Sequence, residues 1–231
     1  MNIAIIPARG GSKRIPRKNV RNFCGKPMIA WSIEAAFASE CFDRVLVSTD
    51  DEEIAAVARA CGAETPFMRP RELADDFAGT IPVISHAVEW LSQRGMGPDL
   101  ACCLYATAPF VAPADLCQAR DLLTDPTIDY VFAAARFPAP IQRALRLNAS
   151  RRIEMFDPTQ ARTRSQDLES AYFDAGQFYW GRRDAWLGAR PIFALTSTVV
   201  LLPRHRVQDI DTEDDWAHAE ILFKMQSAGV P

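Results

Sequence analysis

The chain has 231 residues, of which 48% are hydrophobic and 24% charged, with a formal net charge of −3. This length and balance fit one globular domain that buries its own core, and the slight acidity disfavours a general nucleic-acid-binding protein. No apolar stretch approaches the ~20 residues of a membrane span, and the run at 2–8 is too short for a signal peptide. We therefore expect a cytoplasmic protein with no membrane or nucleic-acid partner.

Short apolar runs alternate with longer amphipathic ones along most of the chain. Strand patterns cover residues 2–6, 44–49, 99–105, 129–135, 177–180 and 196–202. Helical patterns cover residues 27–39, 50–60, 81–93, 113–123 and 212–226. This alternation predicts an α/β fold with a mostly parallel sheet and helices on both faces. The irregular stretch at about 137–174 is predicted to be an insertion within a single domain that spans 1–231.

The loop that follows the first strand, PARGGSKRIPRKN at 7–19, is the richest segment. The first 26 residues contain seven cations and no acid. Ligands of open parallel sheets bind beyond the carboxyl ends of the strands, where this loop should lie. Gly10 and Gly11 let the backbone approach an anion, and Ser12 adds a hydroxyl donor. The pattern predicts that Arg9, Lys13, Arg14 and Lys18 neutralise a triphosphate; the alternative is a flexible surface loop with solvated charges.

A second polar motif, VQDIDTEDDW, places Asp209 and Asp211 two residues apart before the last helical pattern. In extended backbone, residues i and i+2 point to the same side. Paired carboxylates are costly unless a cation lies between them, and Mg²⁺ prefers oxygen ligands. The spacing predicts a divalent-cation site at these two residues. The alternative is that one of the acids caps the helix that begins near Thr212.

The segment IIPARGGSKRIPRKN resembles the opening signature of the cytidylyltransferases that activate sialic acids and related nonulosonates. The similarity continues through GKPMIAWSIEAA, VSTDDEEIA, YATAPF and DIDTEDDW, so it covers nearly the whole chain. It implies a mononucleotide-binding, Rossmann-like domain with a small protruding dimerisation element. It also implies that CTP is coupled to an acidic nine-carbon sugar, with release of pyrophosphate, by a homodimer that uses Mg²⁺ or another divalent cation.

With this resemblance, each candidate residue acquires an expected role. We expect Lys18 and Arg9 to act on the reacting phosphates, and Asp209 and Asp211 to bind the metal. The expected CTP-binding residues are Ala8, Arg9, Gly10, Gly11, Ser12, Lys13, Arg14, Lys18, Asn19, Thr80 and Thr107. The expected sugar-binding residues are Tyr105, Gln142, Arg143, Arg164 and Gln177.

Two segments in the second half of the chain bear on which sugar is recognised. IQRAL at 141–145 and RSQDLESAYFDAGQFYWG at 164–181 resemble the branch of the family that acts on pseudaminic acid, although Phe173 stands where that branch has histidine. An acidic sugar needs a cation for its carboxylate, and Arg164 is the candidate; the alternative for Arg164 is a surface ion pair with Asp167 or Glu169. Sialic acid, legionaminic acid and 3-deoxy-octulosonate remain alternative sugars, and a non-catalytic CTP-binding module is an alternative of another class.

Overall fold

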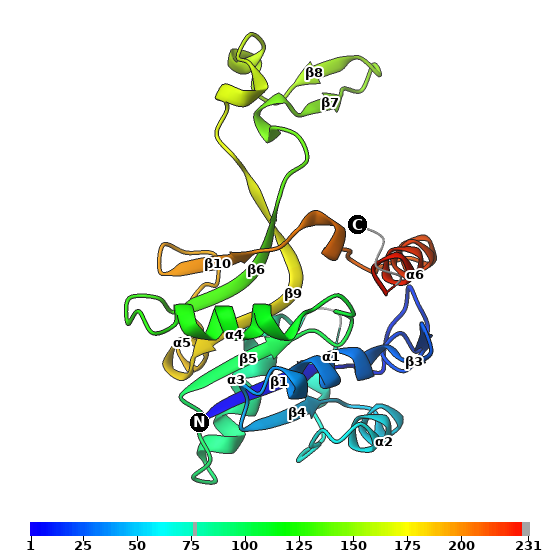
Figure 1. Ribbon diagram of the computed structural model, residues 1–231, viewed down its shortest axis with the longest axis vertical. Helices are drawn as coiled ribbons and strands as arrows, with labels where there is room; N and C mark the ends of the chain where they lie inside the picture. Colours follow the sequence, from blue (N-terminus) through cyan, green and yellow to red (C-terminus); the bar gives the residue numbers. More distant parts are fainter. Residues whose placement is uncertain (76–77, 228–231) are drawn as a thin grey trace.

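The computed structural model describes residues 1–75 and 78–227. Its centre is a six-stranded sheet with the order β10-β6-β9-β5-β1-β4 (Figure 1). The strands are β1 (Asn2–Pro7), β4 (Arg44–Ser48), β5 (Leu100–Leu104), β6 (Tyr130–Arg136), β9 (Tyr172–Arg182) and β10 (Ser197–Leu201). Every neighbouring pair is parallel except those of β9, which runs antiparallel to both β5 and β6. The prediction of a mostly parallel sheet is confirmed.

Helices cover both faces of this sheet, as predicted. One face packs against α1 (Met28–Ala38), α2 (Glu52–Ala60) and α4 (Pro113–Leu122), and the other against α3 (Thr80–Ser92) and α5 (Arg183–Leu187). The alternation of side chains along β1 divides the two cores, because Ala4 and Ile6 face the first set of helices while Ile3 and Ile5 face the second. Both sides of β1 are therefore apolar, as expected for a central parallel strand.

The last helix, α6 (Glu213–Ser227), lies beside the segment just before α1 rather than over the sheet (Figure 1). Its Trp216 and Ala219 share a third small core with Phe23 and Met28, next to the short strands β2 (Asn22–Phe23) and β3 (Lys26–Pro27). This packing brings the segment before α6 close to the loop after β1. None of the helices within 1–75 and 78–227 combines the length and apolar character needed to cross a membrane.

Residues 137–171, here called the arm, protrude from the sheet between β6 and β9 (Figure 1). The arm contains a hairpin of β7 (Leu145–Leu147) and β8 (Ile153–Met155), which pair with each other, and the short 3₁₀ helices η2 (Ile141–Arg143), η3 (Pro158–Gln160) and η4 (Ser165–Asp167). The arm ends slightly before the predicted limit, because β9 begins at Tyr172, which pairs with Arg136. In this early part of β9, exposed residues (Tyr172, Asp174) alternate with half-buried or buried ones, which explains its weak apolar pattern.

Candidate active site

A pocket of about 420 Å³ lies beyond the carboxyl ends of β1 and β5. The loop after β1 forms one wall, and residues 105–107, directly after β5, form another. It is lined by Pro7, Arg9, Ser12, Lys13, Arg14, Ile15, Lys18, Asn19, Arg69, Leu73, Asp75, Ala78, Tyr105, Ala106, Thr107 and Asp211. Most of the expected triphosphate-binding side chains thus lie around one cavity, at the edge of the sheet where parallel folds bind ligands.

Cations of this loop converge on Asp211. A terminal nitrogen of Arg14 lies 2.8 Å from the Asp211 Oδ1, and Lys18 Nζ lies 3.5 Å from the same oxygen. Lys18 also donates to the Ile210 carbonyl at 2.6 Å, while Arg9 donates to the Asp75 carbonyl at 2.8 Å. The loop and the segment before α6, which are almost 200 residues apart in sequence, therefore form one polar surface that can hold anions and a metal together.

Three of the seven early cations are directed elsewhere. Arg17 pairs with Asp51 and Glu53, Arg21 with Glu213, and Lys26 with Glu34. Their charges are offset by acids that lie 8 residues along the chain for Lys26, 34 and 36 for Arg17, and 192 for Arg21. The positive segment is therefore divided into cations that line the pocket and cations that attach the segment to its surroundings.

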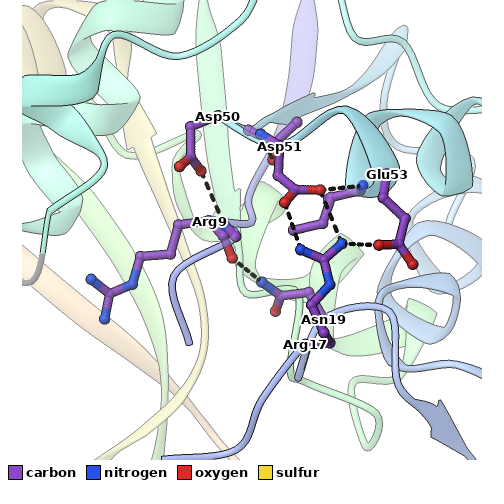
Figure 2. Close-up of polar contacts among 9 residues, drawn as sticks. Arg9, Arg17, Asn19, Asp50, Asp51 and Glu53 are labelled. Carbon is purple, nitrogen blue, oxygen red and sulfur yellow. Dashed lines mark hydrogen bonds and ion pairs between the residues drawn. The ribbon is translucent and has the colours of Figure 1, made fainter. Parts of the chain in front are cut away.

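The backbone of the loop also has a fixed arrangement (Figure 2). The Gly10 N–H donates to Asp50 Oδ1 at 3.0 Å, and the buried Ala8 donates its N–H to the Ser48 carbonyl at 3.0 Å. The Ser12 N–H donates to the Gly10 carbonyl at 3.0 Å. The Ala8 and Gly10 amides thus have protein partners, and Ala8, Gly10 and Gly11 lie beside the pocket wall rather than in its lining.

Thr212 and Asp215 cap α6, so the carboxylates of Asp209 and Asp211 are not used as its cap, and that of Asp211 pairs with Arg14 and Lys18. The Thr212 hydroxyl accepts from the Asp215 N–H at 3.2 Å, and Asp215 Oδ2 accepts from the Thr212 N–H at 2.8 Å. Loss of water around the Asp209 carboxyl, and next the charge of Asp211, raise the pKa of Asp209. A carboxylate whose ionisation is opposed by a neighbouring carboxylate suits a site for a hard cation.

Asp209 and Asp211 also offer the number of carboxylate ligands that Mg²⁺ commonly takes from a protein. Within residues 1–75 and 78–227, no group of three or more His, Cys, Asp or Glu side chains could hold a metal ion. Mg²⁺ commonly takes one or two carboxylates and completes its shell with water and substrate phosphates. Asp209 and Asp211 would supply two such carboxylates; Asp211 lines the pocket, whereas Asp209, two residues earlier, does not.

Arg69 is a pocket residue that sequence reasoning missed. It is only 6% exposed, and its Nε donates to Ser48 Oγ at 3.1 Å. Burial lowers the pKa of Arg69 to about 10, so the guanidinium remains charged at neutral pH. A lone arginine between Met68 and Pro70 matches no motif, and only its burial marks it as a fixed donor.

Tyr105 also lies in the lining, and it connects the pocket to Thr80. The Tyr105 hydroxyl and Thr80 Oγ1 are 2.8 Å apart, so Thr80 lies behind Tyr105 rather than in the lining itself. Burial raises the pKa of Tyr105 to about 12, which keeps the phenol neutral. Tyr105 can therefore donate or accept a hydrogen bond at the pocket wall.

The remaining sugar-binding candidates lie outside this pocket. Gln142, Arg143 and Arg164 are on the arm, where Gln142 Nε2 donates to the Glu169 carbonyl at 3.0 Å and Arg143 to Ser165 Oγ at 3.2 Å. Arg164 is exposed and pairs with Asp167 at 2.7 Å, which is the alternative that its sequence context offered. Gln177 is buried on β9 and donates to the Arg206 carbonyl at 2.5 Å.

Phe173, at the position where the related branch has histidine, packs at the base of the arm. Its ring lies edge-on to the ring of Phe137, with the two centroids 5.1 Å apart. The Phe173 side chain therefore takes part in an apolar contact between the start of β9 and the start of the arm. No polar group is supplied by this side chain.

Comparison with known proteins agrees with this geometry. A family model described as "Cytidylyltransferase" matches residues 3–187. The chain is 49% identical to a pseudaminic acid cytidylyltransferase of Campylobacter jejuni, over 97% of both chains. It is 38% identical, over 90% of its length and 40% of the relative, to a Helicobacter pylori protein named as a pseudaminic acid cytidylyltransferase and UDP-2,4-diacetamido-2,4,6-trideoxy-beta-L-altropyranose hydrolase. A solved CMP:2-keto-3-deoxy-manno-octonic acid synthetase complexed with CTP superposes with a TM-score of 0.70 at 18% identity, covering 97% of this chain and 99% of that one.

Proposed function

The chain belongs to the cytidylyltransferase family, and we propose that it couples CTP to pseudaminic acid, giving the CMP-sugar and pyrophosphate. The observation that carries this proposal is a cation-lined pocket at the sheet edge of a chain that is 49% identical to a pseudaminic acid cytidylyltransferase along almost its entire length. The sugar assignment also draws on the segments at 141–145 and 164–181. We place the reaction in the cytoplasm, where the six free thiols of the chain would remain reduced.

The reaction is an in-line transfer of the cytidylyl group. The anomeric hydroxyl of the sugar attacks the α-phosphorus of CTP, the bond to the β-phosphate oxygen breaks, and pyrophosphate leaves. Such a reaction needs positioning and charge neutralisation rather than covalent help from the protein. Arg9, Lys13, Arg14 and Lys18 supply the positive charge that stabilises the triphosphate and the departing pyrophosphate. Arg69, held rigid by its burial, supplies a fixed donor on the same pocket wall.

We assign Asp209 and Asp211 as the ligands of a divalent cation, with Mg²⁺ as the preferred ion. When bound, the cation would neutralise and orient the phosphates of the nucleotide. Arg14 and Lys18 offset the charge of Asp211, and these cations can turn to the phosphates when a metal ion and CTP bind. The two binding events are therefore expected to support each other.

Sugar recognition is assigned to Tyr105 within the pocket and to the arm of a second copy. Large apolar side chains on the arm are exposed, namely Phe137, Ile141, Leu145, Leu147, Ile153 and Phe156. An apolar surface of this kind favours a two-fold homodimer, in which each arm contacts the other protomer. In such a dimer, Arg164, Gln142 and Arg143 would reach the sugar in the partner's pocket, with Arg164 pairing the sugar carboxylate.

A substrate panel tests the proposed function directly. The purified protein is incubated with CTP, Mg²⁺ and either pseudaminic, N-acetylneuraminic or legionaminic acid or 3-deoxy-octulosonate, while pyrophosphate release and product mass are measured. We expect the highest kcat/KM with pseudaminic acid. A tenfold or greater preference for another sugar would overturn the sugar assignment alone. CTP binding without pyrophosphate release from any acid would instead indicate a non-catalytic CTP-binding module.

A further inference from the structure

The loop after β1 is attached to the start of α2 near both of its ends (Figure 2). Near its beginning, the Gly10 N–H donates to Asp50 Oδ1 at 3.0 Å. Near its end, the Arg17 guanidinium donates to the two carboxylate oxygens of Asp51 at 2.6 and 3.1 Å, and it also contacts Glu53. Asn19 Nδ2 donates to the Arg9 carbonyl at 2.9 Å, which joins the two ends to each other.

Asp51 serves the loop and the helix at once. Its Oδ1 accepts the Ile54 N–H at 3.0 Å and caps α2, while Arg17 binds the same carboxylate from the loop side. The hydrogen bond from Arg17 is the main cause that lowers the pKa of Asp51 to about 2, so the ion pair persists through the neutral range. A Cβ atom at Gly10 would lie 2.6 Å from Asp51 Oδ2, so the loop backbone rests directly on this carboxylate.

Asp50 and Asp51 are acids beside a pocket that we assign to a polyphosphate, and by Coulomb's law alone they would weaken the binding of an anion. Their contacts nevertheless go to the backbone and the side chain of the phosphate-binding loop. Arg17 has a backbone φ of 57°, a conformation uncommon for a residue other than glycine, so the loop is held in a shape that it would not adopt freely.

We propose that Asp50, Asp51 and Arg17 are positioning residues for nucleotide binding. They hold the loop so that its pocket cations already have the spacing that the triphosphate requires, although none of the three has to touch the nucleotide. Without this support the cations would repel one another, and CTP would have to order the loop at a cost to its own affinity. The inference rests on the proposed function, in which this loop binds the triphosphate of CTP.

The variant Asp51→Asn separates positioning from simple electrostatics. Asparagine is as good an N-cap as aspartate, so the cap of α2 is kept while the ion pair with Arg17 is lost. Removal of a negative charge by itself predicts tighter CTP binding. The positioning role predicts the opposite: a Kd and a KM for CTP raised by at least about tenfold, the loss expected when a charge-assisted contact disappears. The sugar KM and the midpoint of thermal unfolding should change little.

Glu213→Gln is the matched control. Glu213 accepts from Arg21 at 2.6 and 2.8 Å, so this variant also removes one acid from an arginine–carboxylate pair of the same cationic segment. Because Arg21 does not line the pocket, we expect the CTP Kd to stay within about twofold of the wild type. A large increase in Kd in both variants would show a general loss of charge balance and would overturn the specific role of Asp51.

A second pair of variants tests Asp50 by conservative rescue. In Asp50→Asn the side-chain oxygen can still accept from the Gly10 N–H, whereas in Asp50→Ala that amide loses its partner. We expect Asp50→Asn to bind CTP almost as the wild type does, and Asp50→Ala to bind up to about tenfold more weakly, since the loop loses the hydrogen bond that attaches Gly10 to Asp50. Equal CTP affinity in the two variants would contradict the role of Asp50.

Calorimetric titration with CTP and Mg²⁺, together with steady-state kinetics, completes the test. The positioning role is overturned if Asp51→Asn binds CTP as tightly as the wild type or more tightly. Arg9→Ala distinguishes this failure from a failure of the proposed function. If Arg9→Ala weakens CTP binding while Asp51→Asn does not, the loop binds CTP and only the positioning role fails. If neither variant weakens binding, the loop is not the triphosphate site.

Discussion

Lys18 is more buried than Lys13 and Arg14, which belong to the same loop and also line the pocket. Its side chain is only 18% exposed, and its ammonium contacts the Ile210 carbonyl and Asp211. An ammonium held in this way can face a leaving pyrophosphate without first losing a full shell of water. Arg14, by comparison, keeps 67% of its side chain exposed. Lys18 is therefore a stronger candidate than Arg14 for stabilising the transition state.

We predict that Lys18→Ala lowers kcat/KM for CTP by at least ~10²-fold, the scale of a lost transition-state donor. The loss should appear in kcat as well as in KM, because the charge on the departing pyrophosphate grows during the reaction. Steady-state kinetics at saturating sugar measure both values. Arg21→Ala, which removes a cation of the same segment outside the pocket, should be nearly neutral. Normal kinetics in Lys18→Ala would remove this residue from the mechanism.

We further predict that Asp211→Asn abolishes most turnover while the protein stays folded. The substitution halves the charge of the expected metal pair, and excess Mg²⁺ should restore only part of the activity. Asp214→Asn, in the first turn of α6, is the control with the same chemical change outside the pocket. Turnover is measured across a Mg²⁺ titration after treatment with EDTA. Wild-type activity that persists without divalent ions would contradict the assignment of Asp209 and Asp211.

At the scale of elements, β9 is closely packed around Gly181, which has buried aromatic side chains against its Cα. A Cβ atom at Gly181 would lie 2.6 Å from Trp186 Nε1 and from two ring carbons of Tyr130, and both aromatic residues are fully buried. Trp186 is fixed further by donating to the Ala101 carbonyl at 3.0 Å. Neither aromatic side chain has free space into which it could move, so the strand requires glycine at position 181.

We predict that Gly181→Ala lowers the free energy of unfolding by about 1–3 kcal/mol, as overpacking of a filled core does. Guanidinium unfolding followed by tryptophan fluorescence measures the change. Gly11→Ala is the control for stability, because its added Cβ would meet no atom within 4 Å. Equal losses of stability in the two variants would contradict the packing argument.

The elements show what the sequence could and could not predict. The strands at 2–6 and 44–49 and the helix at 27–39 were predictable because their periodicity is local, and the cationic loop because its glycines and charges are adjacent. The direction of β9 was not, since a run of apolar residues does not encode its orientation. The contacts of Gly10 with Asp50, and of Arg17 with Asp51, join residues 34 to 40 positions apart, so only the fold reveals them. Arg69 was missed for the same reason.

At the scale of the whole molecule, the arm is an element without a core of its own. Leu147 and Ile153 face each other across the hairpin of β7 and β8, and they are 63% and 62% exposed.

We predict that the wild type is a dimer and that the double variant Leu147→Glu/Ile153→Glu is a folded monomer, because charges on a shared apolar surface oppose association. Light scattering at micromolar concentration measures the mass. Leu195→Glu, at a fully exposed leucine outside the arm, should leave the dimer intact. A monomeric, fully active wild type would contradict the prediction.

The proposed dimer predicts that residues of the arm contribute to the active site of the partner protomer. If Arg164 pairs with the carboxylate of a sugar in the partner's pocket, each active site combines Lys18 of one protomer with Arg164 of the other. Homodimers of Arg164→Ala should then show a sugar KM raised far more than the CTP KM, because a buried carboxylate loses its partner.

Mixed dimers separate action on the partner's pocket from action within one protomer. A heterodimer of one Lys18→Ala chain and one Arg164→Ala chain has one site with both residues intact and one with neither, provided that Arg164 acts across the interface. Its activity should reach about half that of the wild type, since one of two equivalent sites works. If Arg164 acts within its own protomer, both sites are defective and activity stays at the level of the mutant homodimers. Two differently tagged chains, co-expressed and purified over both tags, yield the heterodimer. Activity no higher than the average of the two mutant homodimers would rule out the proposed sharing of residues between protomers.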